Sequence, residues 1–375
     1  MTTDNNFNNQ RPKFRVLVAP LDWGLGHATR CIPIINELIN LNCEVFVAAD
    51  KLNFSLLKKE FPSVKFLRLK VYEMKYSQNK NWLPVKMLLQ IPKIALSIWK
   101  ENRWMKRITG QYKLDAVISD NRFGMYSDKI FCIYITHQLF IKTGNIFTDK
   151  IAQRIHNYFI KKYTNCWVPD CKENGLAGKL SHPQKIPSNV KYIGPLSRFE
   201  TLINIERKFD LLVSISGPEP QRSIFEKIIL LQLRHFTGSA LVLRGLPSET
   251  NSISSPNNLV TIANHLPAKD FNIALQQSEM IISRSGYTSI MDLIKLKKKA
   301  ILIPTPGQTE QEYLAKYLFN KKYFYLAGQE NFSLKEVLNK TATFPFAELN
   351  FSSEDYKIVI HEFVLSLKTG NFAPQ

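Results

Sequence analysis

Short apolar runs alternate with helix-like segments along the whole chain. The first half contains RVLVA, EVFVAA, VKFLRL, DAVIS and FCIYIT, and the second half contains LLVSIS, ALVLR, LVTIA, MIISRS and AILIP. Strands that are apolar without alternation are typical of parallel sheets that helices cover on both faces. The sequence therefore predicts an α/β protein.

This alternation pauses over residues 195–209, PLSRFETLINIERKF, and then resumes. A chain of 375 residues exceeds the usual size of a single hydrophobic core. We therefore predict two Rossmann-like, doubly wound domains, over residues 1–199 and 200–350. Residues 351–375 contain the pattern of a capped helix, which we expect to pack back on the first domain.

The positive charge is concentrated in the first half of the chain. Residues 1–199 contain 31 Lys and Arg against 14 Asp and Glu, a surplus of 17, whereas the rest of the chain has a surplus of 2. The first half can therefore face an anionic partner.

The five cysteines are odd in number, which suits a reducing compartment, and Cys166 and Cys171 lack a second pair at a zinc-like spacing. Neither a signal peptide nor a membrane-spanning apolar stretch is evident in the sequence. We therefore expect a cytoplasmic protein that contacts a membrane at most at its surface, and no metal site.

The segment LDWGLGHATR joins a predicted strand to a predicted helix. Gly24 and Gly26, with Asp50 as a ribose acid, suggest a dinucleotide fingerprint, but Thr29 occupies the third small position and the connection is long. In a second interpretation the glycines let the backbone approach a ligand, and His27, with an ordinary pKa of about 6.5, accepts a proton from a hydroxyl. His27 can equally cap the helix or satisfy a buried carbonyl.

Polar residues also follow other predicted strands of the first half. Asp120 and Asn121 follow VIS, and His137 follows YIT. Ligands of open α/β sheets bind beyond the carboxyl ends of the strands. Asp120 can orient His27 or be the base itself, whereas His137 is more often an ordinary loop histidine.

In the second half, MIISRSGYTSIMD has the pattern of a strand, a turn and a helix. Ser283, Arg284, Ser285 and Gly286 form the turn, which places hydroxyls and N–H groups at a helix N-terminus that favours a phosphate. Asp292 lies nearly two helical turns further on and can accept hydrogen bonds from ribose hydroxyls.

A second turn, SISGPEPQR, adds further candidate phosphate contacts. Gly217 supplies an amide-rich turn, and Arg222 can offset phosphate charge or remain solvated.

This half of the chain resembles the donor site of GT-B glycosyltransferases, specifically the C-terminal domain of glycosyltransferase family 28, to which the peptidoglycan GlcNAc transferase MurG belongs. The residues that match the pattern are Ser283 to Gly286, Asp292 in place of the usual Glu, Pro304, Pro306, Gln311 and Ala315. The loop from Gly24 to His27 looks like the glycine loop of the family's N-terminal domain, although it has fewer glycines than MurG.

The resemblance implies two domains that face each other across a cleft, and transfer of a sugar, GlcNAc, from a UDP-sugar with inversion and without a metal or other cofactor. It implies that His27 or Asp120 deprotonates the acceptor, a lipid-linked or other envelope glycan. Gly24, Gly26, Asn121 and His137 would then lie near the acceptor or the donor phosphates.

The resemblance also assigns further donor contacts. The loop at His265 and Leu266 holds the uracil ring through backbone groups in relatives. Gln308, Thr309 and Gln311 would contact the sugar, although Gln308 and Thr309 stand where relatives often carry His or Asp.

Residues 80–113 contain eight Lys and Arg and one acid. Lys86, Lys93, Lys100 and Arg107 repeat every seven residues and share one helical stripe beside apolar residues. This favours a helix that lies on an anionic bilayer, although lysines above a core-facing helix give the same pattern. Charge alone also permits nucleic acid, but no nucleic-acid motif accompanies it.

Three other functions stay open on the sequence alone. A UDP-GlcNAc 2-epimerase shares the architecture and would release UDP-ManNAc without an acceptor. An NAD enzyme would use the first glycine loop. A non-catalytic membrane- or glycan-binding protein would keep the scaffold without the chemistry.

Overall fold

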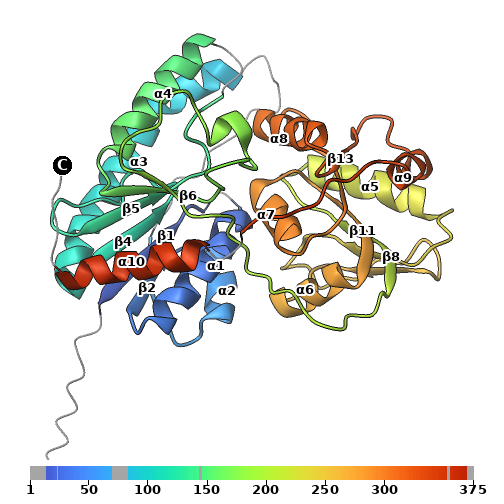
Figure 1. The fold of residues 1–375 in the computed structure, drawn as a ribbon, viewed down its shortest axis with the longest axis horizontal. Helices are drawn as coiled ribbons and strands as arrows, with labels where there is room; N and C mark the ends of the chain where they lie inside the picture. Colours follow the sequence, from blue (N-terminus) through green and yellow to red (C-terminus); the bar gives the residue numbers. More distant parts are fainter. Residues whose placement is uncertain (1–13, 23, 70–82, 143–145, 353–354, 370–375) are drawn as a thin grey trace, which may run out of the picture.

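The computed structural model describes residues 14–22, 24–69, 83–142, 146–352 and 355–369. Two parallel sheets, each covered by helices, lie side by side in the molecule (Figure 1). The predicted α/β class with two Rossmann-like sheets is confirmed.

The first sheet has the strand order β3-β2-β1-β4-β5-β6-β7, and every pairing in it is parallel. Its central strands are apolar and buried on both faces, so that residues 16–19 of β1 have no exposed surface. The strands are β1 (Arg15–Pro20), β2 (Glu44–Ala49), β3 (Lys65–Arg68), β4 (Ala116–Asp120), β5 (Phe131–Ile135), β6 (Asn165–Val168) and β7 (Val190–Tyr192).

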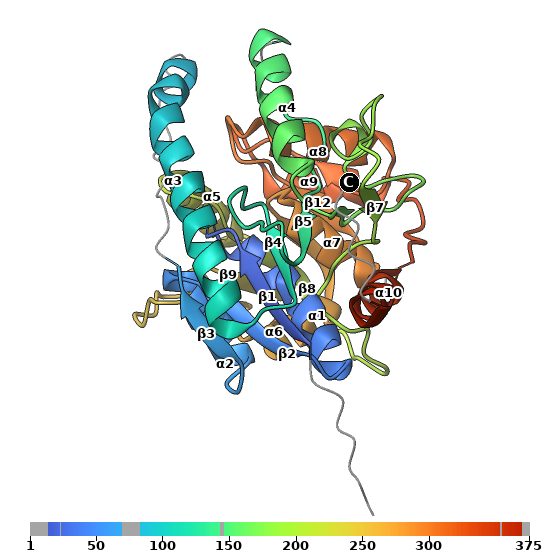
Figure 2. The ribbon, with the colours of Figure 1, turned by 90° about the vertical axis from the view of Figure 1, so that its left-hand side faces the viewer.

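Four α-helices of the described chain accompany this sheet before the chain crosses to the second sheet: α1 (Leu25–Asn40), α2 (Lys51–Glu60), α3 (Leu83–Tyr112) and α4 (Ile146–Ile160). The 30-residue helix α3 continues across Pro92. Figure 2 shows that α3 and α4 extend past the sheet in the same direction.

The second sheet has the order β10-β9-β8-β11-β12-β13 and is also parallel. Its strands are β8 (Phe209–Ser214), β9 (Ala240–Leu243), β10 (Val260–Ala263), β11 (Ser278–Ser283), β12 (Ala300–Leu302) and β13 (Tyr325–Leu326). Its helices are α5 (Gln221–Leu233), α6 (Ala268–Gln276), α7 (Tyr287–Lys295), α8 (Thr309–Asn320) and α9 (Leu334–Ala342).

The chain crosses twice between the sheets. Residues 193–208 lead from β7 to β8, and residues 343–352 lead back toward α10 (Asp355–Thr369), which packs against α1 beside the first sheet (Figure 1). The ring of Phe363 on α10 contacts Phe131 and Trp167 of the first domain. Burial of this apolar contact holds the C-terminal helix on the first domain.

Each sheet has one point at which the strand order reverses. This point lies between β1 and β4 in the first sheet and between β8 and β11 in the second. The loops that leave two such strands diverge, and the crevice between them is the usual ligand site of doubly wound sheets.

Candidate active site

His27 and Asp120 meet at the reversal point of the first sheet. Pro20 pairs with Asp120 in the sheet, so the loop after β1 starts beside the end of β4. His27 Nδ1 lies 3.0 Å from Asp120 Oδ2. The side chain of Asp120 is fully buried and that of His27 is 17% exposed, so a ligand can reach only the histidine.

The two groups have complementary protonation states near neutral pH. Burial alone would raise the pKa of Asp120, but Arg30 and His27 outweigh burial and lower that pKa to about 2. Burial lowers the pKa of His27, and Asp120 offsets only part of this effect. An ionised Asp120 beside a neutral His27 is the arrangement of a general base and its orienting carboxylate.

Arg30 completes this cluster, although the sequence motifs described above assign it no role. Its Nε donates to Asp120 Oδ2 at 2.8 Å, and its Nη2 contacts Asp120 Oδ1. Both side chains are buried, so the guanidinium compensates a carboxylate that would otherwise be costly to bury. The spacing of His27 and Arg30, three residues apart on a predicted helix, is the sequence signal that places them on one face.

The two glycines of the first loop have different roles. Gly24 has a φ of 98°, and a Cβ there would meet nothing within 4 Å, so it leaves open space at the start of α1. A Cβ at Gly26 would lie 3.1 Å from Thr288 Oγ1, and the Thr288 hydroxyl donates to the Gly26 carbonyl. The close approach predicted at Gly26 is therefore made by α7 of the second domain.

Asn121 and His137 are both engaged within the protein. Asn121 Oδ1 accepts a hydrogen bond from the Tyr134 hydroxyl at 3.2 Å. His137 is buried, contacts Glu310 of α8 at 2.7 Å and stacks on Tyr287 of α7. The structure thus places His137 at the contact between the domains.

The turn at residues 283–286 lies at the reversal point of the second sheet, beside Gly217, whose φ is 109°. The Ser283 hydroxyl donates to the Arg284 carbonyl, and the Ser285 hydroxyl donates to the Gln311 carbonyl. Gly286 precedes α7, which has no side-chain cap. The N–H groups of its first turn, rather than the serine hydroxyls, are therefore the groups suited to hold an anion.

Arg222 and Arg284, two of the predicted donor contacts, are both engaged within the second domain. Arg222 is buried and pairs with Glu219 and Glu226. Arg284 is 1% exposed, donates to four main-chain carbonyls and to Gln329 Oε1, and has its pKa lowered by burial to about 10. Both guanidinium groups point into the domain, because their hydrogen bonds and ion pairs with buried carbonyls and carboxylates outweigh the loss of their hydration.

A second polar group lies further along α7. Asp292 is buried and accepts a hydrogen bond from the Ser197 hydroxyl at 2.6 Å. Burial raises the pKa of Asp292 to about 6, against the opposing effects of Arg198 and Ser197. Arg198 Nε is buried without a hydrogen-bond partner in the described structure, so this crossing segment adds a cation that no motif indicates.

The loop at His265 and Leu266 lies near this group. His265 is exposed, and burial of part of its ring, followed by Arg198, lowers its pKa. Leu266 is half-buried against the core.

Residues 308–311 form the start of α8. Gln311 accepts from the Thr305 amide at 2.9 Å and donates to Gln308, so these two predicted sugar contacts are bonded to their own loop. Thr309 is exposed. Glu310 is not part of the family motif, but it contacts His137 of the first domain.

Lys93, Lys100 and Arg107 are exposed on α3, and Lys86 lies where side chains are not described. The same helix exposes Leu96 and Trp99, and α4 exposes Ile151, Ile155 and Tyr158. The basic stripe therefore lies beside exposed apolar side chains on two helices that extend past the sheet (Figure 2).

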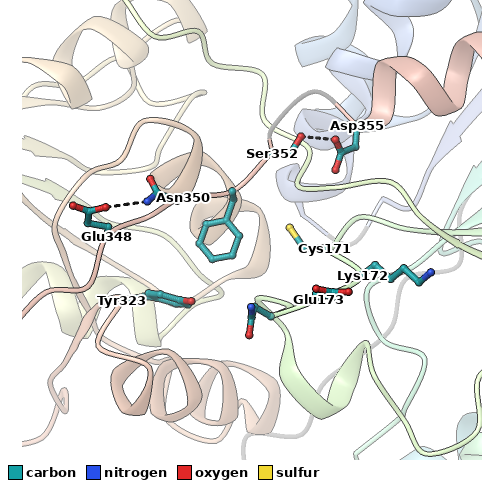
Figure 3. A pocket seen from close by; sticks show the side chains of 10 residues that line it. Cys171, Lys172, Glu173, Tyr323, Glu348, Asn350, Ser352 and Asp355 are labelled. Atoms are coloured by element: carbon teal, nitrogen blue, oxygen red, sulfur yellow. Dashed lines mark hydrogen bonds between the residues drawn. The ribbon is translucent and has the colours of Figure 1, made fainter.

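A cavity of about 510 Å³ opens elsewhere, where the returning segment meets the first domain (Figure 3). Cys171, Tyr323 and Phe351 line it, and Ser352 is hydrogen-bonded to Asp355 at its rim. It contains none of the predicted site residues.

Among the described residues, no group of three or more His, Cys, Asp or Glu side chains could hold a metal ion. Within the same part of the chain, every helix is too short or too polar to span a bilayer.

Residues 218–357 match the model of the glycosyltransferase family 28 C-terminal domain. An uncharacterized glycosyltransferase of Methanosarcina acetivorans is 21% identical over 326 residues, which cover 80% of this chain and 81% of that protein. Both matches support a glycosyltransferase.

Solved structures agree with this fold. MurG of Acinetobacter baumannii superposes with a TM-score of 0.52 at 12% identity, covering 97% of this chain and 96% of MurG. A structure described as a putative UDP-N-acetylglucosamine 2-epimerase of Listeria monocytogenes superposes with a TM-score of 0.57 at 11% identity, covering 96% and 97% of the two chains. At these identities the two superpositions establish the shared architecture.

Proposed function

Since the chain is a MurG-like glycosyltransferase with the GT-B fold, we propose that it transfers GlcNAc from UDP-GlcNAc to a hydroxyl of a lipid-linked or other envelope glycan, with inversion. The observation that carries the proposal is the 3.1 Å hydrogen bond from Thr288 to the Gly26 carbonyl. It brings the anion-binding start of α7 to within one residue of His27, so a base and a leaving diphosphate can act on one sugar.

In the proposed reaction His27 Nε2 takes the proton of the acceptor hydroxyl. The oxygen forms a bond to the anomeric carbon from the face opposite the diphosphate, and the bond from that carbon to the diphosphate oxygen breaks. Asp120 stabilises the resulting imidazolium, because it remains ionised. The electron pair leaves on the diphosphate, which the N–H groups of α7 bind.

Arg284 has a supporting role in this scheme. Its buried guanidinium has only carbonyl and amide acceptors among its hydrogen-bond partners, so its charge is not neutralised by a hydrogen-bonded carboxylate. Buried directly behind the start of α7, it raises the positive potential at the diphosphate without touching it. We propose that this charge and the helix N-terminus make a metal ion unnecessary.

The nucleoside would lie toward Asp292, with the ribose hydroxyls replacing Ser197 as donors to its carboxylate. Arg198 and the backbone of residues 265–266 would border the base. Gly24, which leaves open space at the start of α1, would face the acceptor or the phosphates.

We also propose that the acceptor is presented by an anionic membrane, on which the exposed faces of α3 and α4 rest. Lys93, Lys100 and Arg107 would contact lipid headgroups, while Trp99 and Ile155 enter the interface. A cytoplasmic protein held at the membrane surface fits this proposal.

Calorimetric titration with UDP, UDP-GlcNAc, GDP and NAD tests the donor class. We expect binding of UDP and UDP-GlcNAc, and none of GDP or NAD. Binding of NAD alone, or of none of the four, would contradict the proposal. Formation of UDP-ManNAc from UDP-GlcNAc without an acceptor would instead identify an epimerase, the alternative that the shared fold keeps open.

A further inference from the structure

The two domains contact each other through the imidazole of His137. Its Nε2 donates to Glu310 Oε1 in the first turn of α8 at 2.7 Å. Its ring lies flat on Tyr287 of α7, with 4.2 Å between ring centroids and 8° between planes. Because His137 is itself buried, two elements of the second domain fix the orientation of this first-domain side chain.

The opposite edge of the same imidazole faces Arg30. Arg30 Nη1 donates to His137 Nδ1 at 3.3 Å, and the same guanidinium binds both oxygens of Asp120. Asp120 in turn contacts His27. A continuous series of hydrogen bonds therefore connects Glu310 of the donor domain to the base.

The chemistry of these groups determines where the protons lie. Arg30 has only N–H donors, so His137 Nδ1 accepts and the His137 proton lies on Nε2, toward Glu310. His27 Nδ1 is close to both Arg30 Nη2, at 2.8 Å, and Asp120. Arg30 Nη2 donates to Asp120 Oδ1, and the ionised carboxylate is the stronger acceptor for an imidazole N–H. We therefore assign the proton to Nδ1, which leaves Nε2 bare to act as the base.

The charges of the cluster favour this state. With both histidines neutral, one cation faces two carboxylates, Asp120 and Glu310, and a proton that arrives on His27 cancels the surplus charge. Burial opposes ionisation of Glu310, whereas the hydrogen bond from His137 and the charge of Arg30 favour it, and the Glu310 pKa is lowered. The other titratable neighbours, Cys31, Tyr134 and Tyr287, stay neutral because burial raises their pKa values.

We propose that Arg30 and His137 are positioning residues that couple Glu310 to His27, so that the base is primed only when the donor domain is closed on the first domain. This rests on the role of His27 in the proposed function. When the second domain moves away, His137 loses both Glu310 of α8 and Tyr287 of α7, and Arg30 loses a fixed acceptor. A donor bound to the open enzyme would then be protected from attack by water.

The test uses the full chain with ¹⁵N-labelled histidines and follows tautomers and titration by long-range ¹H–¹⁵N NMR, with His27→Gln assigning the His27 signals. Glu310→Gln removes the charge and keeps an acceptor for His137. Glu312→Gln is the matched control, since it removes a carboxylate of the same helical turn that instead accepts from the Gly307 amide. No nucleotide is needed.

We expect the Nδ1–H tautomer at His27 and the Nε2–H tautomer at His137. Glu310→Gln should lower the His27 titration midpoint by about half a pH unit, and Glu312→Gln should not. In a His137→Phe chain, which keeps an aromatic ring on Tyr287, Glu310→Gln should move that midpoint by less than half as much. Such a reduction indicates coupling through His137.

Equal shifts from the two glutamate variants, an undiminished shift in the His137→Phe chain, or the Nε2–H tautomer at His27 would overturn the proposal. Calorimetry with UDP-GlcNAc on the same samples tests the proposed function separately. If the expected tautomers and titration shifts are observed but UDP-GlcNAc does not bind, the proposed function is contradicted and this inference is not. If UDP-GlcNAc binds but the expected tautomers and titration shifts are not observed, this inference is contradicted and the proposed function is not.

Discussion

His27 Nδ1 lies 3.0 Å from Asp120 Oδ2, although 93 positions of the chain separate the two residues. The sheet brings them together because β1 and β4 are adjacent and parallel, so their carboxyl ends share one edge. In this pair the histidine is accessible to a ligand, whereas the carboxylate is inaccessible to water. This relationship leads to the first three predictions.

Replacing His27 by Gln should slow transfer by about a thousandfold and leave UDP-GlcNAc affinity unchanged, because Gln cannot accept the proton of the acceptor. UDP release in the presence of a glycolipid extract and calorimetry measure the two quantities. His235→Gln, at an exposed position after α5, is the control. Normal turnover in His27→Gln would assign the base to another group.

Replacing Asp120 by Asn should lower the free energy of unfolding at pH 7 by about 3 kcal/mol, because Arg30 would stay buried without its counter-charge. Urea unfolding measures this loss, and Asp128→Asn, at an exposed carboxylate, should change little. An Asp120→Asn chain as stable as the control would show that the Arg30 charge is not compensated by Asp120.

The stability that Asp120 contributes should also depend on pH. Its pKa is lowered from the ordinary value to about 2 in the folded chain, so its contribution is present above about pH 4 and is lost as the pH falls toward 2. The unfolding free energy of the wild-type chain should therefore approach that of Asp120→Asn in acid. A gap between the two chains that is unchanged at low pH would contradict this assignment.

Affinity for UDP-GlcNAc should rise with pH between 5 and 7. The pKa of Asp292 is raised to about 6, and only the ionised carboxylate can accept from both ribose hydroxyls. UDP-GlcNAc is the preferred ligand, because the terminal phosphate of UDP itself titrates at about pH 6. Calorimetry should find weaker, pH-independent binding for Asp292→Asn and wild-type behaviour for Asp270→Asn, which alters an exposed acid on α6.

Replacing Lys93, Lys100 and Arg107 together by Gln should weaken binding to phosphatidylglycerol-containing vesicles about a hundredfold, at roughly 1 kcal/mol per basic side chain. Vesicle sedimentation measures the effect, which should be absent on neutral vesicles. A control that replaces three exposed lysines of α5 and α9, Lys227, Lys335 and Lys340, should bind normally. Equal loss of vesicle binding in both triple variants would show that the net charge of the protein, and not the position of these residues on α3, causes the binding.

Much of the fold follows from local patterns. Apolar strands without alternation predict the parallel sheets, and the turn before Tyr287 predicts a helix N-terminus; both are present in the structure. The same patterns do not predict which acceptors the long side chains of arginine bind. Arg222 and Arg284 stand in apparent ligand loops, yet Arg222 pairs with Glu226, one turn further along α5, and Arg284 donates to Gln329, 45 positions away in the chain.

By itself the sequence determined the two parallel sheets and the glycine turns at their strand ends, because hydrophobic periodicity and loop motifs are local properties. The glycosyltransferase class followed from the resemblance of one of these loop motifs to a known family. Only the tertiary structure decided that Gly26 makes room for Thr288, that Arg30 neutralises Asp120 and that His137 contacts Glu310. Those contacts join residues up to 262 positions apart. The packing of two separate domains sets their distances, and no local pattern records that packing.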